Sequence, residues 1–188
     1  MTVSTSALIG EPLPLDLINT RAYTPAGDID ALSRPDTFHA WLVAQAGRLS
    51  PIDVQVTERE LDQVRAVRDH IRDIVADVRL GQRPTDEALH VLVEAQLAAP
   101  AFRELAWVGG SFEASRRRVG SAVDGLVAEL AEATVDFMAT NPVGRLRECD
   151  GPGCHMVFLP VHPNRRWCSP ALCGNRVRVA RYYQRHSN

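Results

Sequence analysis

All four cysteines of this 188-residue chain lie within its last 40 residues, in two pairs with the same internal spacing. Four residues separate the members of each pair, and thirteen separate the pairs; the cysteines are Cys149, Cys154, Cys168 and Cys173. Two pairs separated by a hairpin-length segment can converge on one tetrahedral ion, as in structural zinc sites. We therefore expect one Zn²⁺ in a C-terminal module.

The residues around the cysteines favour such a site. The loop between Cys149 and Cys154 contains two glycines and a proline, which allow a turn tight enough for both sulfurs to face inward. Residues 155–167 predict a β-hairpin around the turn-prone segment PVHPN. Ser169 and Pro170 predict the start of a helix, with Cys173 in a first turn that favours a thiolate. Knuckle, hairpin and helix in this order predict a treble-clef-like zinc finger.

Other uses of the cysteines fit the sequence less well. Two disulfides would suit a secreted protein, but residues 1–10 lack the basic start of an export signal. A redox or catalytic thiol pair would favour a two-residue spacing and a nearby acid or base. His155 and His162 are alternative ligands, although surface or turn positions suit them better. No stretch reaches the ~20 apolar residues of a membrane span, so we expect a cytoplasmic protein without membrane contact.

The charge of the chain changes sign near Gly144. Residues 1–144 contain 13 arginines against 21 acidic residues, a net charge of −8, whereas residues 145–188 contain 8 arginines against two acidic residues, a net charge of +6. Asn141, Pro142 and Gly144 form a natural boundary. We expect an α-rich domain over residues 1–144 and a basic zinc finger over residues 145–188, where a polyanion would bind.

The first domain is predicted to be mainly helical. Thr57 and Glu60 form a capping box that opens an apolar stripe ending at Gly81. Further helices are predicted over residues 35–47, from Thr85 to before Pro100, and over 121–138; the stripe of the second has Leu89, Leu92, Val93 and Leu97. Residues 10–19 alternate loosely and carry two prolines, which suits a short edge strand, and residues 102–118 suit a hairpin around Gly109 and Gly110. The fold class is α+β.

Arginines follow the cysteines along the predicted tail helix. A rotation of ~100° per residue puts Arg178, Arg181 and Arg185 on one stripe. Guanidinium groups bind phosphate well, so we expect DNA as the partner, with Arg165 and Arg166 adding contacts from the preceding segment. Asn175 can read a base edge or cap the backbone. Arg176 can contact DNA or hold the carbonyls of the knuckle.

The segment Cys173-Gly174-Asn175-Arg176 has the motif of a known family. With Arg147, Cys149 and Cys154 upstream, it resembles the CGNR-type zinc finger over roughly the last 44 residues. Residues 15–20, LDLINT, are similar to the ABATE domain that usually precedes this finger. The resemblance implies a stress-induced transcriptional regulator that binds DNA.

A regulator needs an input, and the acidic domain offers a candidate. Asn19, Thr20, Arg21 and Trp41 combine polar groups with an aromatic ring and can line a pocket for a small-molecule effector. Alternatively, Trp41 belongs to the core, Arg21 is solvated, and Asn19 and Thr20 end a strand. The sequence contains no phosphate-binding glycine loop, nucleophile elbow or HExxH helix, so we expect no enzyme.

These observations predict a zinc-containing, DNA-binding transcriptional regulator, with a homodimer as a further candidate assembly. The alternative is a zinc-stabilised protein-interaction module without direct DNA binding. Its arginine stripe would then meet an acidic surface, which could be that of its own first domain.

Overall fold

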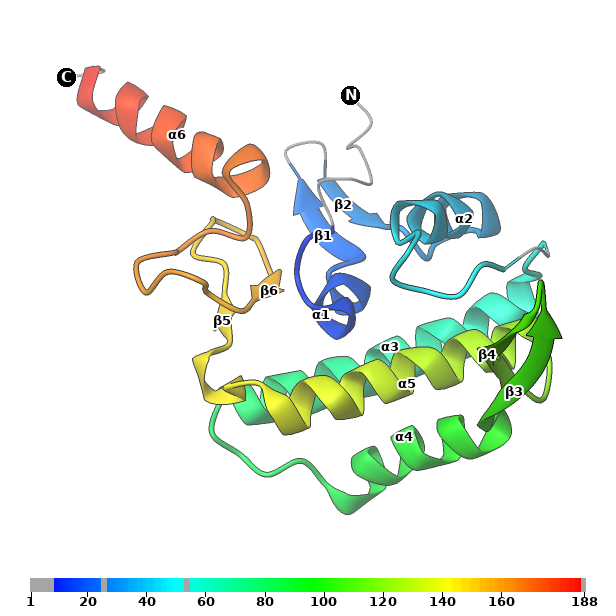
Figure 1. Ribbon diagram of the computed structural model, residues 1–188. Helices are drawn as coiled ribbons and strands as arrows, with labels where there is room; N and C mark the ends of the chain where they lie inside the picture. Colours follow the sequence, from blue (N-terminus) through cyan, green and yellow to red (C-terminus); the bar gives the residue numbers. More distant parts are fainter. Residues whose placement is uncertain (1–8, 25–26, 53–54, 187–188) are drawn as a thin grey trace.

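The computed structural model describes residues 9–24, 27–52 and 55–186 (Figure 1). Within these ranges the side chains of eight residues lie outside the description: Tyr23, Thr24, Ala171, Ala180, Arg181, Tyr183, Gln184 and Arg185. The protein is α+β and about 51% helical, with small antiparallel sheets. The predicted fold class is confirmed.

Three helices form the body of the molecule: α3 (Glu58–Arg79), α4 (Asp86–Ala98) and α5 (Ala122–Thr140). They lie side by side in Figure 1. The predicted capping box opens α3, where the Thr57 side chain accepts from the Glu60 N–H and the Glu60 carboxylate accepts from the Thr57 N–H. Gly81, at φ +72°, follows its C-terminus, and Ser121 caps α5 in the same way as Thr57 caps α3.

The N-terminal segment is helical, so the predicted edge strand is wrong. Helix α1 spans Leu13–Ile18, with Pro12 at its N-cap and Pro14 in its first turn, where no intrahelical N–H is required. Every residue of α1 is buried, which explains the error. A short helix covered on all sides shows no apolar period in its sequence.

Two further pieces complete the first domain. Strands β1 (Arg21–Thr24) and β2 (Gly27–Asp30) pair antiparallel, and α2 (Pro35–Ala44) follows within the segment predicted as helical. The predicted hairpin is present as β3 (Ala101–Val108) and β4 (Ser111–Arg118), joined by Gly109 and Gly110, both with positive φ.

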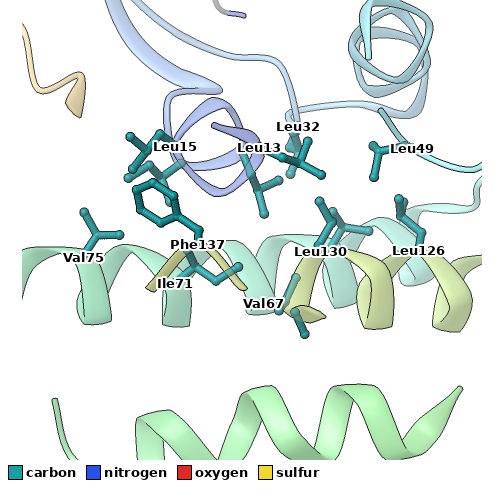
Figure 2. Close-up of a cluster of buried hydrophobic side chains, with 14 of the residues drawn as sticks. Leu13, Leu15, Leu32, Leu49, Val67, Ile71, Val75, Leu126, Leu130 and Phe137 are labelled. Carbon is teal, nitrogen blue, oxygen red and sulfur yellow. The ribbon is translucent and has the colours of Figure 1, made fainter. Parts of the chain in front are cut away.

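The main core lies between α1 and the pair α3 and α5. Figure 2 shows Leu13 and Leu15 of α1 above Val67 and Ile71 of α3, with Phe137 of α5 near Leu15. The core continues toward the tail through Leu146 and Val157. The zinc-finger segment therefore shares its hydrophobic core with the helical body.

The face of α4 differs from the prediction. Of its four stripe residues only Leu92 is buried, whereas Leu89, Val93 and Leu97 are exposed. The helix has packed against α3 and α5 through one edge of the stripe, and most of the stripe faces solvent.

Candidate metal centre

The four cysteines meet at one point in the tail. Their Sγ atoms all lie within 4.8 Å of one another, all four side chains are buried, and none forms a disulfide. Cys149 and Cys154 flank the knuckle between β5 (Arg147–Glu148) and β6 (Val157–Phe158), and Cys173 lies in the helical turn η3 (Pro170–Gly174). Four converging thiols match the ligand set and number of a closed zinc site.

The strand pair that supports the cluster differs from the hairpin predicted over residues 155–167. Strand β6 pairs backward with β5 across the knuckle, and the Cys149 N–H donates to the Met156 carbonyl at 2.9 Å. Residues 165–167 form no strand; the Arg166 carbonyl accepts from the Asp150 N–H at 2.9 Å. The four-residue loop between Cys149 and Cys154 allows β5 and β6 to pair directly. The two prolines within residues 160–163 disfavour the strand pairing that was predicted around them.

The start of the tail helix matches its prediction. The Ser169 hydroxyl accepts from the Leu172 N–H, Pro170 is the first residue of η3, and α6 (Asn175–His186) continues from it. This arrangement fixes Cys173 in the first turn, where the exposed N–H groups and the helix dipole favour negative charge. The tail thus has the knuckle, strand pair and helix of a treble-clef-like finger.

Hydrogen-bond donors near the cysteine sulfurs favour the anionic thiolate form of these side chains. The N–H groups of Gly151 and Cys168 donate to the Cys149 Sγ at 3.4 and 3.2 Å, and the Arg176 Nη2 lies 3.3 Å from the Cys173 Sγ. Hydrogen bonds from Cys154 and Cys168 lower the pKa of Cys149 to about 2. The contact with Cys149 raises the pKa of Cys154 to about 12, although the contact with Cys168 acts in the opposite direction. The contacts with Cys149 and Cys154 both raise the pKa of Cys168. A divalent cation would stabilise all four thiolates together, so the donor set fits Zn²⁺.

Two of the predicted DNA-binding arginines hold the cluster in place. Arg176 donates from Nη2 to the Pro152 carbonyl at 2.9 Å, the structural role considered for it from the sequence. Arg165 donates to the Trp167 and Cys168 carbonyls, pairs with Glu11 at 2.5 Å and lies over the Phe158 ring. Both residues therefore have a bracing contact in the structure, and their contact with DNA stays a prediction.

Three of the remaining predicted DNA-binding residues are exposed on the tail: Arg166, Asn175 and Arg178. Asn175 and Arg178 are exposed and lie 3.5 Å apart between Oδ1 and Nη1. Arg166 is exposed and pairs with Asp150 at 2.7 Å. The side chains of Arg181 and Arg185 lie outside the described residues, so their predicted stripe with Arg178 rests on their spacing in α6.

The predicted effector residues have other partners in the structure. Asn19 is buried and exchanges two hydrogen bonds with the Val157 backbone, and Thr20 is buried against Arg68. Trp41 stacks on Phe38 in the core, and Arg21 is exposed beside Asp30 and Asp69. These side chains do not converge on one site, and the effector pocket stays a prediction.

The comparisons with known proteins assign the chain to a family. A family model named ABATE, described as "Putative stress-induced transcription regulator", matches residues 11–141. The chain belongs to the ABATE family. The CGNR zinc finger model matches residues 145–186, and together with the cysteine cluster it identifies zinc as the cofactor. Neither family is one of enzymes.

Two further comparisons are brief. No curated protein matches this ABATE chain. Among the described residues, every helix is too short or too polar to cross a membrane.

Sequence reasoning missed the residues that join the finger to the ABATE domain. Asp16 of the LDLINT motif accepts from the N–H groups of Gly10 and Glu11, and the Glu11 carboxylate accepts from the Leu159 N–H and binds Arg165. Asn19 of the same motif binds Val157. The occurrence of Asp16 and Asn19 in an apolar segment indicated that their side chains would be buried and hydrogen-bonded. The sequence could not show which groups would be their partners.

Proposed function

We propose that Cys149, Cys154, Cys168 and Cys173 bind one Zn²⁺ and that the zinc-bound finger binds DNA through α6, with the ABATE domain as its regulatory part. The observation that carries this proposal is a helix rich in arginine, without any acidic residue, that begins at the cysteine cluster. Figure 1 supports it, since α6 projects away from the helical body.

Electrostatics favour a polyanionic partner. After Asp150 the sequence contains no acidic residue, whereas six arginines follow it. Four thiolates and one Zn²⁺ have a net charge of −2, so the +6 of residues 145–188 becomes about +4 in the zinc-bound finger. This charge suits a patch with a few phosphate contacts.

The arginines divide into two classes. Arg165 and Arg176 brace the metal centre, whereas Arg166, Arg178, Arg181 and Arg185 are the proposed phosphate contacts. Asn175, exposed at the start of α6, is the proposed contact to a base edge. We also propose that the protein is located in the cytoplasm, as expected for a DNA-binding regulator.

The test measures the affinity of the full-length, zinc-loaded protein for duplex DNA across a range of salt concentrations. Arg178→Ala, Arg181→Ala and Arg185→Ala should each weaken binding to all sequences and reduce the salt slope by about one unit per lost contact. Zinc content should stay unchanged. The matched control is Arg83→Ala, which removes an exposed arginine paired with Asp86 in the ABATE domain and should leave DNA affinity unaltered.

Arg176→Ala separates bracing from contact. This variant should lose zinc to a chelator more readily, because the Pro152 carbonyl and the Cys173 Sγ lose their donor. If the three α6 variants bind DNA like the parent at every salt concentration, α6 does not face DNA, and the finger is a protein-interaction module instead.

A further inference from the structure

A second exposed surface lies at the end of the body opposite the finger. Figure 1 shows the β3–β4 hairpin at one end of α3 and α5 and the tail at the other. On one face of the hairpin Leu105, Trp107 and Phe112 are 66%, 64% and 69% exposed, and the two rings meet edge to face at 4.7 Å. Proteins rarely leave a paired Trp and Phe in solvent without a partner.

The exposed stripe of α4 lies next to this hairpin in the chain. Leu89, Val93 and Leu97 recur at every fourth position, and Leu97 is 70% exposed. Helix α4 ends at Ala98 and β3 begins at Ala101, so the helix that carries the stripe leads directly into the hairpin. We call them the α4 stripe and the hairpin face.

The charges beside the two surfaces are opposite. Arg103 shares the hairpin face with Leu105 and Trp107, because side chains alternate along a strand, and among the described residues it has no acidic partner. Glu87 and Glu94 lie beside the α4 stripe, and both are exposed. Within the described part of the chain Glu94 has one ion-pair partner, His90, at 3.4 Å. An apolar face with an unpaired arginine therefore matches an apolar stripe edged with carboxylates.

We propose that the hairpin face binds the α4 stripe of a second copy of this chain in a two-fold symmetric dimer. Each copy carries both complementary surfaces on consecutive elements, so a two-fold axis can form both contacts at once and close the assembly. The occupant is the chain itself because the match in charge lies between two surfaces of the same molecule.

The apolar area is sufficient for this contact. Large aromatic side chains bury about 150–250 Å² each, so the exposed parts of Trp107 and Phe112 alone supply roughly 200–300 Å² per copy. With Leu105, the α4 stripe and the charged rim, each copy approaches the about 800 Å² that a standard interface buries per partner. Burial would also stabilise the hairpin, since an isolated two-stranded hairpin is marginal in water.

The first test is sedimentation of the full-length, zinc-loaded protein over a dilution series. A monomer–dimer equilibrium is expected. Trp107→Ser should raise the dimer dissociation constant at least about tenfold, as expected for a central aromatic contact. The matched control is Phe102→Ser, an exposed aromatic residue on the other face of the same strand, which should leave dimerisation unchanged. A parent protein that stays monomeric throughout the series overturns the proposal.

A charge exchange tests which surface the hairpin meets. Arg103→Glu and the double variant Glu87→Arg/Glu94→Arg should each weaken the dimer, and the triple variant with all three changes should recover most of the affinity. If Arg103→Glu weakens the dimer but the changes in α4 have no effect, the hairpin pairs with something other than the α4 stripe, and the proposal is wrong. None of these residues lies in the finger, so the test is independent of the proposed DNA binding.

Discussion

Gly151 shows how closely the knuckle loop approaches the tail helix. A Cβ built on Gly151 would lie 2.8 Å from the Cys173 Sγ and 3.1 Å from the Arg176 Nη2. Real Cβ atoms do not approach sulfur so closely, so either a cysteine or the bracing arginine would have to move. The absence of a side chain here allows the first cysteine pair to reach the second, which is a close approach of backbone that only glycine permits.

We therefore predict that Gly151→Ala reduces zinc affinity about 10- to 100-fold, the range found when groups that orient metal ligands are disturbed. Competition with a chromogenic chelator measures the loss. Gly144→Ala is the control, because a Cβ at that position meets nothing within 4 Å. Equal zinc affinity of the two variants would contradict the crowding at Gly151.

A partly buried charge pair joins strand β2 to helix α3. Arg68 is fully buried and donates from Nη1 to the Asp30 carboxylate at 2.6 Å and to the Thr20 hydroxyl at 3.0 Å. Burial by itself raises the pKa of Asp30, but the hydrogen bonds from Arg68 and from the Leu32 N–H outweigh it and lower the pKa below 3.8. The ionised carboxylate thus holds the β1–β2 hairpin against the body.

Asp30→Asn should lower the free energy of unfolding at neutral pH by about 2 kcal/mol, since the buried Arg68 guanidinium loses its partner at 2.6 Å and retains the more distant Asp69 carboxylate, 3.5 Å from its Nε. The folded pKa of Asp30 lies below its unfolded value, so its contribution is fully present above pH 3.8 and is lost as the pH falls through the folded pKa. The difference between parent and variant should therefore shrink below pH 3.8.

Urea unfolding at several pH values measures this difference directly. Asp36→Asn serves as the control, because Asp36 forms a solvent-exposed pair with Arg34 and should matter little at any pH. A parent–variant difference that stays constant to the lowest pH would show that Asp30 is not the titrating group.

Direct contacts join the finger to the ABATE domain. Val157 of the finger donates to and accepts from the Asn19 side chain at 2.8 and 2.7 Å, and Arg79 of α3 pairs with Glu148 of β5 at 3.1 Å. Ala22 of β1 in turn packs among the cysteines. Because Asn19, at the C-terminus of α1, takes its buried hydrogen bonds from the finger, zinc should stabilise the whole chain and not the tail alone.

Removal of zinc by a strong chelator should therefore lower the melting temperature of the helical body. The loss of the two Asn19–Val157 hydrogen bonds alone is worth about 2 kcal/mol, or roughly 4–8 °C for a chain of this size. Far-UV circular dichroism follows the transition, and Cys173→Ser should reproduce the shift without chelator. A body that melts at the same temperature with and without zinc would mean that the two parts fold independently.

The sequence by itself determined the features that depend on near neighbours. The cap at Thr57, the stop at Gly81 and the hairpin turn at Gly109 each involve groups only a few residues apart, and each appears in the structure as predicted. The cysteine cluster belongs to this class as well, because its spacing and flexible loop are sufficient for the four thiols to converge.

Only the tertiary structure decided the features that depend on distant partners. Residues 13–18 form a helix that the rest of the protein covers on all sides. Leu89 of α4 is exposed because α4 packs against α3 and α5 through the edge of its stripe that contains Leu92. Asn19 and Arg165 found their partners 138 and 154 residues away. A buried polar atom must be satisfied, but which group satisfies it is fixed only when the chain has packed, so the bonds of Arg165 to Glu11 and to the Cys168 carbonyl could not be predicted from the sequence.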